Sequence, residues 1–452
     1  MGSVIFVLHP VLKEERGVGG ASVRRSDCAQ LEEAVSLARG VNNDKNTHRV
    51  VDTLSHIRPA TFFGRGKMEA LGATFKEHSV EVVIVNHALT PVQQRNLERA
   101  WQVKVLDRTG LILEIFAARA RTREGRLQVD LARLTYQKSR LVRTWTHLER
   151  QRGALGFVGG PGETQIEADR RLIQKRITQL RRRLETVRRT RALHRKPRQK
   201  APWPTIVLVG YTNAGKSTLF NHITGASVMA DDRLFATLDP TIRNIDLPSG
   251  RRVVLSDTVG FISNLPTHLV AAFRATLEEI VESDIILHVQ DSSHPDMRAQ
   301  AADVVEVLGS FGINEPCSGS GQDEMRKSPK IVQVLNKIDR LPHDSRETGS
   351  NKGIPISAMT GEGVDALLNH LDTLLGAQET IISLDLGPAD EACRAWLYRH
   401  SRIVSQHNEA GRIFLEVAFS SVALGRFQKR FPQISLSQAD FSGLEASRVA
   451  QP

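Results

Sequence analysis

The chain has 452 residues, of which 61 are Lys or Arg and 50 are Asp or Glu, so its net charge is +11; 40% of its residues are hydrophobic. This composition excludes a wholly disordered chain and predicts a soluble, basic protein of two to four domains, at about 100–200 residues per domain. Cys28, Cys317 and Cys393 lie too far apart for a zinc or redox motif and are too few for a disulfide scaffold. The apolar runs are too short for a secretory signal or for a membrane-spanning helix of about 20 residues.

Residues 4–121 alternate between short apolar runs and helical patterns, which predicts a small α/β domain with a largely parallel sheet over residues 1–121. We expect strands at 4–9, 49–57, 80–86 and 103–107, and helices at 27–39, 67–78 and 91–101. The stretch Gly64-Arg65-Gly66-Lys67 superficially resembles a phosphate-binding loop, but no glycine stands five residues before Gly66. We therefore interpret it as the start of a helix.

Residues 122–196 carry two heptad seams of apolar residues, which predict an antiparallel helical hairpin whose apolar stripes face each other. The first seam consists of Leu127, Leu131, Leu134, Leu141, Trp145 and Leu148, and the second of Ile166, Ile173, Ile177, Leu180, Leu184 and Val187. The glycine-rich tip, residues 152–162, holds Leu155, Phe157 and Val158. It is either a turn that tucks these side chains into a core or a flexible probe that orders against a partner.

The basic charge of the chain is concentrated in this hairpin region. Residues 117–200 contain 24 basic and 7 acidic residues, a net charge of +17, whereas the rest of the chain has a net charge of −6. Runs of one sign occur on solvated helix faces and linkers, on nucleic-acid-binding segments and on helices that bind anionic membranes. The scarcity of acidic residues favours a polyanionic partner, nucleic acid above all.

The proline-containing segment 197–204 is expected to end the second helix and to link it to another α/β domain, residues 205–378. That domain opens with a strand pattern at 205–210. A match to the phosphate-loop pattern GxxxxGK[ST] and a helical pattern follow it, the match being Gly210-Tyr211-Thr212-Asn213-Ala214-Gly215-Lys216-Ser217. In such a loop the backbone N–H groups surround phosphate oxygens, the lysine reaches the β- and γ-phosphates, and the serine binds Mg²⁺.

Three further motifs follow strand-like runs in the order and spacing of a GTP site. Asp257-Thr258-Val259-Gly260 places an aspartate near Mg²⁺ and a glycine N–H near the γ-phosphate, and Ser357-Ala358 fits the last loop that contacts the base. In Asn336-Lys337-Ile338-Asp339, the aspartate accepts hydrogen bonds from N1–H and the exocyclic amine of guanine, while the asparagine orders the loop. Adenine would leave that carboxylate unpaired, so the domain is predicted to bind GTP.

A first switch is expected at residues 234–241, between the phosphate loop and Asp257. Thr237 is the predicted second hydroxyl on Mg²⁺, and Thr241 is the alternative. Such a residue explains switching, because the γ-phosphate and Mg²⁺ hold the segment ordered until hydrolysis releases it.

The chain resembles the HflX family of ribosome-associated GTPases over nearly its whole length. The resemblance is carried by residues 160–171 (GPGETQIEADRR), 210–221 (GYTNAGKSTLFN), 234–241 (LFATLDPT), 257–262 (DTVGFI) and 336–339 (NKID). It implies a nucleotide-binding-like α/β domain, a helical hairpin, a P-loop GTPase domain with a mostly parallel sheet, and a small α/β C-terminal domain. It also implies Mg²⁺-dependent GTP hydrolysis, binding to the large ribosomal subunit and its rRNA, and splitting or rescue of stalled ribosomes under stress.

The resemblance carries over to individual residues of this chain. Lys216, Thr237 and Gly260 are implied to be catalytic, and Ser217 and Thr237 to bind the metal, with Asp257 near the ion but not bonded to it. Phosphate contacts are implied for Gly210–Ser217, for Phe235, Ala236, Thr237, Leu238 and Asp239, and for Asp257, Thr258, Val259 and Gly260. Guanine contacts are implied for Asn336, Lys337, Ile338, Asp339, Ser357, Ala358 and Met359.

Two features depart from the common pattern. Phe261 stands where many GTPases place a glutamine that orients the attacking water, and an apolar side chain cannot do this. We therefore expect slow intrinsic turnover, with the site completed by a partner, a backbone group or a monovalent cation. Asn213 is the position at which related loops hold K⁺. The Ser- and Gly-rich stretch 314–330 is expected to be a surface loop with no assigned role.

The resemblance further implies a monomeric, cytoplasmic protein, with partial association with membranes left open. Two alternatives remain: a regulatory GTPase that acts on a protein partner without RNA, and an RNA-remodelling NTPase with a second nucleotide site. Residues 1–121 contain no GxxxxGK[ST] pattern, which disfavours the second alternative. In the C-terminal domain, 379–452, the expected core residues are Leu384, Trp396, Tyr398, Phe414, Phe419 and Phe427.

Overall fold

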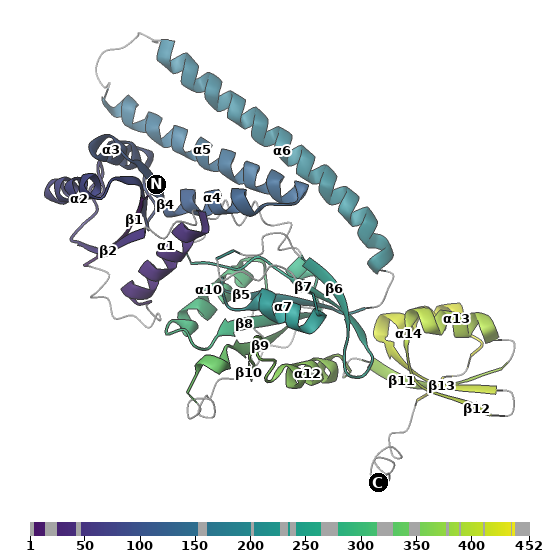
Figure 1. The fold of residues 1–452 in the computed structure, drawn as a ribbon. Helices are drawn as coiled ribbons and strands as arrows, with labels where there is room; N and C mark the ends of the chain where they lie inside the picture. Colours follow the sequence, from purple (N-terminus) through teal and green to yellow (C-terminus); the bar gives the residue numbers. More distant parts are fainter. Residues whose placement is uncertain are drawn as a thin grey trace. The chain divides into compact units, whose positions relative to one another are not determined.

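The computed structural model of the chain (Figure 1) describes residues 4–13, 25–41, 47–151, 161–199, 203–226, 234–235, 241–263, 279–313, 329–342, 353–376, 379–387, 390–409, 412–434 and 436–438. The chain divides into two compact units. The first comprises Met1–Arg189, Ile206–Arg243 and Leu255–Glu362, and the second comprises Thr190–Thr205, Asn244–Val254 and Gly363–Pro452.

The first unit begins with a four-stranded parallel sheet of order β2-β1-β3-β4. Its strands are β1 (Val4–Leu12), β2 (Thr47–Leu54), β3 (Val80–Val85) and β4 (Lys104–Asp107), and its helices are α1 (Asp27–Val41), α2 (Arg65–Glu77), α3 (Pro91–Trp101) and α4 (Arg108–Arg119). The predicted α/β class is confirmed. Successive β1 residues pack into different hydrophobic clusters: Val7 joins residues of α1 and α4, and Leu8 joins residues of α2 and α3. The sheet is therefore covered on both faces.

Helix α4 was not among the predicted elements. The Asp107 side chain caps it by accepting a hydrogen bond from the Gly110 N–H at 2.8 Å. Its buried residues Leu111, Ile112, Ile115 and Phe116 follow helical spacing. Both signals stand in the sequence, but α4 begins at Arg108, directly after the last residue of β4, so no turn residues mark the boundary between the two elements.

Two long helices follow, α5 (Arg123–Gln151) and α6 (Pro161–Gln199). On α6 the seam residues with described side chains are buried at Ile177 and Leu184 and half-buried at Ile173, Leu180 and Val187. On α5 the seam leucines with described side chains, Leu127, Leu131, Leu134 and Leu141, are all half-buried, and the buried Val129 and Ala132 lie off the seam, so the predicted seam is not the most buried line of this helix. The reason is that α5 packs against α3 and α4, so its most buried line faces the parallel sheet domain. Residues 152–160 of the tip lie outside the described residues.

Helix α6 ends at Gln199, within the segment 197–204 that was expected to end it, although it continues two residues past Pro197. A proline removes the hydrogen bond to the carbonyl four residues earlier, but only two residues of the helix follow Pro197. In the described part of the chain, no helix is long and apolar enough to cross a membrane.

A second sheet has six strands in the order β10-β9-β8-β5-β7-β6. The pairs β5–β8, β8–β9 and β9–β10 are parallel. The strands are β5 (Thr205–Gly210), β6 (Thr241–Asp246), β7 (Arg252–Asp257), β8 (Ile285–Asp291), β9 (Lys330–Asn336) and β10 (Ile354–Pro355), with helices α7 (Lys216–Thr224), α10 (Met297–Ser310) and α12 (Val364–Gly376). Strand β5 is buried from Ile206 to Gly210, as expected for a central strand.

The C-terminal sheet is antiparallel, with the order β12-β13-β11-β14. It comprises β11 (Glu379–Leu386), β12 (Arg402–Glu409), β13 (Arg412–Ser420) and β14 (Ser437–Gln438), with helices α13 (Glu391–His400) and α14 (Ser421–Arg430). Four predicted core residues are buried, namely Leu384, Trp396, Phe419 and Phe427. Tyr398 and Phe414 are not core residues, being 51% and 39% exposed. On β13 the buried residues Leu415, Val417 and Phe419 alternate with outward positions, and residue 414 is one of these.

Candidate nucleotide site

The phosphate loop lies between the end of β5 at Gly210 and the start of α7 at Lys216. Gly215 has a φ of 90°, and a Cβ there would overlap the Asn336 side-chain amide, so only glycine fits. Lys216 is 6% exposed and folds back over the loop, where its Nζ donates to the carbonyls of Gly210 (3.1 Å) and Tyr211 (2.7 Å). Burial lowers the pKa of Lys216 to about 8, against a smaller raising effect of Asp257.

Side-chain oxygen atoms that could bind a metal ion lie beside the first turn of α7. The Ser217 hydroxyl donates to Asp257 Oδ2 at 2.7 Å, and Asp257 ends β7 in a fully buried position. A second buried hydroxyl, Thr212 Oγ1, has no hydrogen-bond partner among the residues that the structure describes. Hydroxyl and carboxylate oxygens are the ligands that Mg²⁺ prefers, together with phosphate oxygens. The residues present therefore fit a magnesium–nucleotide complex.

The segment after Asp257 is paired with the phosphate loop. The Phe261 N–H donates to Gly210 O at 3.1 Å, and Phe261 O accepts from the Thr212 N–H at 2.8 Å. Gly260 is packed so closely that a Cβ there would lie 2.9 Å from Thr212 Cα and 3.1 Å from Lys216 Nζ. The Phe261 side chain is 2% exposed and belongs to the hydrophobic core. This buried phenyl ring carries no polar group that could orient an attacking water.

The residues predicted to recognise the base are joined to the phosphate loop through Asn336. Its Nδ2 donates to Ala214 O at 2.8 Å, and its Oδ1 accepts from the Ala358 N–H at 2.9 Å. The Ser357 hydroxyl donates to Asp339 Oδ1 at 2.7 Å, which orients that carboxylate. Two predicted loops and the phosphate loop therefore meet at one asparagine, the ordering role expected of it.

Other predicted site residues are placed differently. The Thr258 hydroxyl donates to Leu208 O at 2.7 Å, and Val259 is buried, so both side chains serve the core. The Phe235 side chain packs edge-on against Phe116 of α4, with ring centroids 4.7 Å apart, and belongs to the hydrophobic core. The side chain of Met359 is 81% exposed. Residues 236–240, with the predicted Ala236, Thr237, Leu238 and Asp239, lie outside the described residues.

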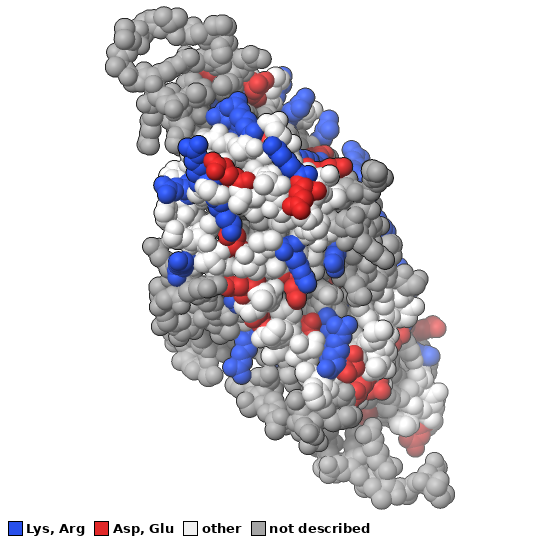
Figure 2. Space-filling view, turned by 60° about the vertical axis from the view of Figure 1, so that its left-hand side comes forward, with Lys and Arg blue, Asp and Glu red and all other residues white. Residues whose placement is uncertain are grey.

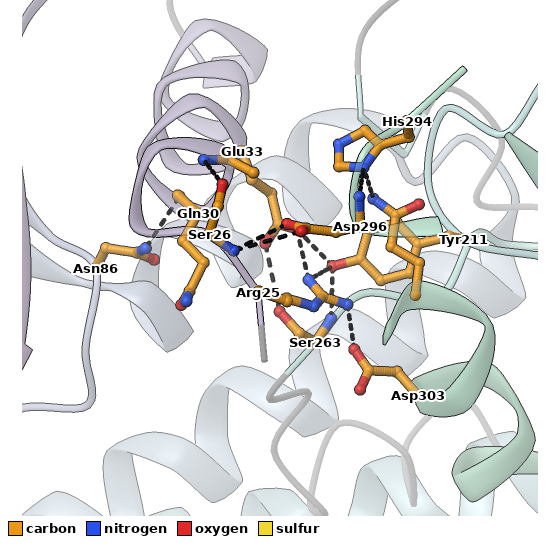
Figure 3. A network of polar contacts seen from close by, with 12 residues as sticks. Arg25, Ser26, Gln30, Glu33, Asn86, Tyr211, Ser263, His294, Asp296 and Asp303 are labelled. Atoms are coloured by element: carbon orange, nitrogen blue, oxygen red, sulfur yellow. Dashed lines mark hydrogen bonds and ion pairs between the residues drawn. The ribbon is translucent and has the colours of Figure 1, made fainter. Parts of the chain in front are cut away.

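Three residues of the N-terminal domain, residues 1–121, contact this site, and none of them is among the predicted site residues. Arg25 and Glu33 contact the Tyr211 hydroxyl (Figure 3). Arg108 contacts Ser263. One signal in the sequence marks Glu33, because it precedes the buried Leu37 by four residues and so places a carboxylate on the apolar face of α1. No local pattern marks Arg25 or Arg108.

Family models match the chain in four consecutive parts. The descriptions are GTP-binding GTPase N-terminal for residues 28–117, GTP-binding GTPase Middle Region for 119–198, 50S ribosome-binding GTPase for 205–337, and HflX C-terminal domain for 344–441. The chain is 48% identical over 410 residues to the GTPase HflX of Magnetococcus marinus, covering 90% of this chain and 92% of that protein. It is 44% identical over 382 residues to the GTPase HflX of Escherichia coli, covering 83% and 86%.

The chain belongs to the HflX family of GTPases.

Among solved structures, this HflX chain is similar to a GTP-binding protein from the hyperthermophilic archaeon Sulfolobus solfataricus in complex with GDP, with 25% identity over 82% of this chain and 98% of that one and a TM-score of 0.41. Family membership and the P-loop fold identify the chain as a GTPase. Such folds generally use GTP together with Mg²⁺.

One buried histidine makes the stability of the HflX GTPase domain depend on pH. His288 on β8 is 1% exposed, and burial, helped by Lys216, lowers its pKa to about 4. The unfolded chain, with a histidine pKa of about 6.5, binds a proton that the folded chain does not. The free energy of unfolding is therefore expected to fall by about 1.4 kcal/mol per unit as the pH decreases from about 6.5 towards 4.

Urea unfolding at pH 7 and pH 5 tests this. The decrease between the two pH values should be about 2 kcal/mol smaller in His288→Gln than in the unmodified chain. The control is His370→Gln, which changes an exposed histidine of α12. Equal decreases in the unmodified chain and in His288→Gln would contradict a neutral, buried His288.

Proposed function

We propose that this HflX GTPase is a nucleotide-gated factor that binds the large ribosomal subunit and its rRNA through the α5–α6 hairpin and splits or rescues stalled ribosomes under stress. The observation that carries the proposal is a groove between α5 and α6. Most of the residues that line it are basic: Lys138, Arg170, Arg171 and Lys175. The family description of residues 205–337 as a 50S ribosome-binding GTPase supports the choice of the ribosome.

Helix α6 continues this basic surface. Its described, exposed cations include Arg176, Arg181, Arg182, Arg183 and Arg189. Figure 2 shows basic and acidic side chains mixed over the face drawn, so the whole of that face is not a basic surface. The α5–α6 groove is more strongly biased, because Glu167 is the one acidic residue among the described residues that line it. Closely spaced cations with few acidic neighbours suit the regularly spaced phosphates of an RNA backbone.

For the nucleotide we propose the following roles. Gly210–Ser217 hold the phosphates, with Lys216 on the β- and γ-phosphates, and Gly260 donates its N–H to the γ-phosphate. Ser217 and Thr237 bind Mg²⁺, with Asp257 beside the ion, and a K⁺ ion near Asn213 is part of the proposal. Mg²⁺ supplies neutralisation of phosphate charge. Guanine is recognised by Asn336–Asp339 and by Ser357, Ala358 and Met359.

The hairpin contact is tested with a variant that removes three charges from the groove: Arg170→Ser, Arg171→Ser and Lys175→Ser. We expect a weaker affinity for large subunits in the presence of a non-hydrolysable GTP analogue. The plot of log affinity against log salt concentration should become shallower by about 2. Each phosphate contact releases roughly 0.7–0.9 counterion, and this variant makes three fewer contacts. The measurement is co-sedimentation across a salt series, with GTP, GDP and the analogue compared at each concentration.

The matched control removes three exposed charges from the N-terminal domain: Arg65→Ser, Lys76→Ser and Arg99→Ser. It should keep the salt slope of the unmodified chain. An unchanged slope in the groove variant would contradict the hairpin as the contact. Absence of co-sedimentation with any nucleotide would favour a regulatory GTPase that acts on a protein partner.

A further inference from the structure

The hydroxyl of Tyr211, in the proposed phosphate loop, lies in a polar cluster built by residues from distant parts of the first unit (Figure 3). It accepts a hydrogen bond from Arg25 Nη1 at 2.7 Å and donates to Glu33 Oε2 at 2.5 Å. It also accepts from the backbone N–H of Ser263 at 2.9 Å. The Arg25 guanidinium lies over the tyrosine ring, 4.8 Å from its centroid. One hydroxyl thus joins the start of α1, the phosphate loop and the segment after Gly260.

The same cluster also contacts the carbonyl and the hydroxyl of Ser263. Arg108, the first residue of α4, donates to the Ser263 carbonyl and to its hydroxyl, each at 3.1 Å. Arg108 is in turn ion-paired with Glu33. Tyr211 holds the N–H of Ser263, Arg108 holds its C=O, and both side chains contact Glu33. The backbone at Ser263 therefore has little freedom.

Glu33 remains ionised at this junction. Burial alone would raise the pKa of Glu33, but Arg108, the hydrogen bond from Tyr211 and the charge of Arg25 together hold it below its usual range. A buried carboxylate that is paired in this way favours one arrangement, because removing a partner leaves a buried charge uncompensated.

Arg25 and Ser26 attach the cluster to α10 as well. Arg25 forms an ion pair with Asp303 of α10, and the Ser26 N–H lies 3.3 Å from both carboxylate oxygens of Asp296, the residue before that helix. The residues just before α1 are thus held against α10 of the nucleotide-binding domain, and these contacts fix the position of Arg25 in the cluster.

The cluster bears on the reaction through Gly260. Tyr211 O accepts from Lys216 Nζ, and Tyr211 pairs with Phe261 in a parallel bridge. Ser263 is only three residues beyond Gly260, whose position leaves no room for a Cβ beside Thr212 and Lys216. Fixing Tyr211 and Ser263 therefore fixes the backbone around Gly260 against the phosphate loop.

We propose that Glu33, together with Arg25 and Arg108, is a positioning residue for GTP hydrolysis. It acts through the Tyr211 hydroxyl and the Ser263 peptide, and it keeps the Gly260 N–H aligned with the phosphate loop. The inference rests on the proposed roles of Gly210–Ser217 and Gly260. A positioning residue affects the reaction step more than ground-state binding, since the geometry of the reacting groups is what it fixes.

The test compares Tyr211→Phe, Glu33→Gln and the double variant by steady-state GTP hydrolysis. Tyr211→Phe removes one hydroxyl and leaves the loop backbone intact, so it remains informative if Glu33→Gln folds poorly. We expect each single variant to lower kcat about tenfold while KM for GTP changes less than about twofold. The double variant should be no slower than the slower single variant, because both changes act on the same junction: Tyr211→Phe removes the hydroxyl, and Glu33→Gln removes the charge that Arg25 and Arg108 pair with.

The matched control is Glu32→Gln, which changes the exposed neighbour on α1 and should leave kcat unchanged. An unchanged kcat in Tyr211→Phe, or effects that multiply in the double variant, would overturn the proposal. A change confined to KM would do the same. Failure of the proposed phosphate site is recognised separately, because Lys216→Ala would then keep its GTP turnover.

Discussion

Replacing Lys216 by alanine is expected to lower GTP turnover at least about a hundredfold, the size of effect seen when one charge-stabilising group is removed from a reaction centre. Nζ of Lys216 already lies inside the phosphate loop, held by the carbonyls of Gly210 and Tyr211. Its neighbourhood carries negative charge from Asp257 and will carry more when phosphates enter. Lys216 is the one described side chain proposed to contact the β- and γ-phosphates. Initial rates of phosphate release at saturating GTP measure the effect.

The matched control for Lys216→Ala is Lys67→Gln. Lys67 follows the glycine of a sequence that superficially resembles a phosphate loop, but it lies in the first turn of α2 and pairs with Asp52 at 2.7 Å. Glutamine can still donate to Asp52, and turnover should stay at the unmodified rate. Thermal unfolding of both variants separates lost chemistry from lost folding. GTP hydrolysis by Lys216→Ala at the unmodified rate would show that the site is elsewhere.

The phosphate loop and its neighbouring strands were predictable because their signals are local. A buried strand, a glycine with positive φ and a helix start at Lys216 each require particular residues within a dozen positions. The role of Asn336 was predictable for a different reason: the carboxyl ends of parallel strands meet at one edge of the sheet, so β5 and β9 bring their loops together.

The cluster around Tyr211 could not be predicted in the same way. Glu33, Tyr211 and Ser263 belong to three segments far apart in sequence, and their meeting depends on how α1 docks on α10 and the phosphate loop. Only the placement of Glu33 on the apolar face of its helix hinted at a buried partner. Long-range polar contacts leave no periodic pattern in a single sequence, because each depends on tertiary packing.

The errors in the helices and the C-terminal core have a related cause. A heptad pattern on α5 shows that the helix has an apolar stripe, but not which neighbour buries it. In this chain α3 and α4 pack against α5, so part of the apolar surface of α5 faces these helices and not α6. On β13, Phe414 is apolar but lies on the exposed face of the strand, because the direction of a side chain along a strand is decided by alternation and not by residue type. The first-switch threonine, Thr237, stays a prediction.

Replacing Asp339 by asparagine is expected to change which base the GTPase accepts. The carboxylate of Asp339 is oriented by the Ser357 hydroxyl and is proposed to accept from two donors of guanine, N1–H and the exocyclic amine. An asparagine amide can accept through its oxygen, but its NH₂ group would face a donor. Losing one hydrogen bond to a charged group, at about 1.5–3 kcal/mol, and leaving a donor of guanine unpaired, at about 1–3 kcal/mol, corresponds to a loss in GTP affinity of about a thousandfold.

The same chemistry predicts a gain for another nucleotide. Xanthine has a carbonyl where guanine has its exocyclic amine, so the amide introduced by Asp339→Asn would find an acceptor there, and xanthosine triphosphate should become the better substrate of this variant. Competition between GTP and xanthosine triphosphate, measured as the ratio of their kcat/KM values, tests the exchange. Asp365→Asn, an exposed carboxylate in the first turn of α12, is the control and should keep the preference for GTP. A general loss of activity toward both nucleotides would mean that Asp339 supports the fold of the loop. A reversed ratio of the two kcat/KM values would identify Asp339 as the residue that selects the base. An unfolded loop would lower the activity toward both nucleotides, whereas only a specific contact with the base can reverse the preference.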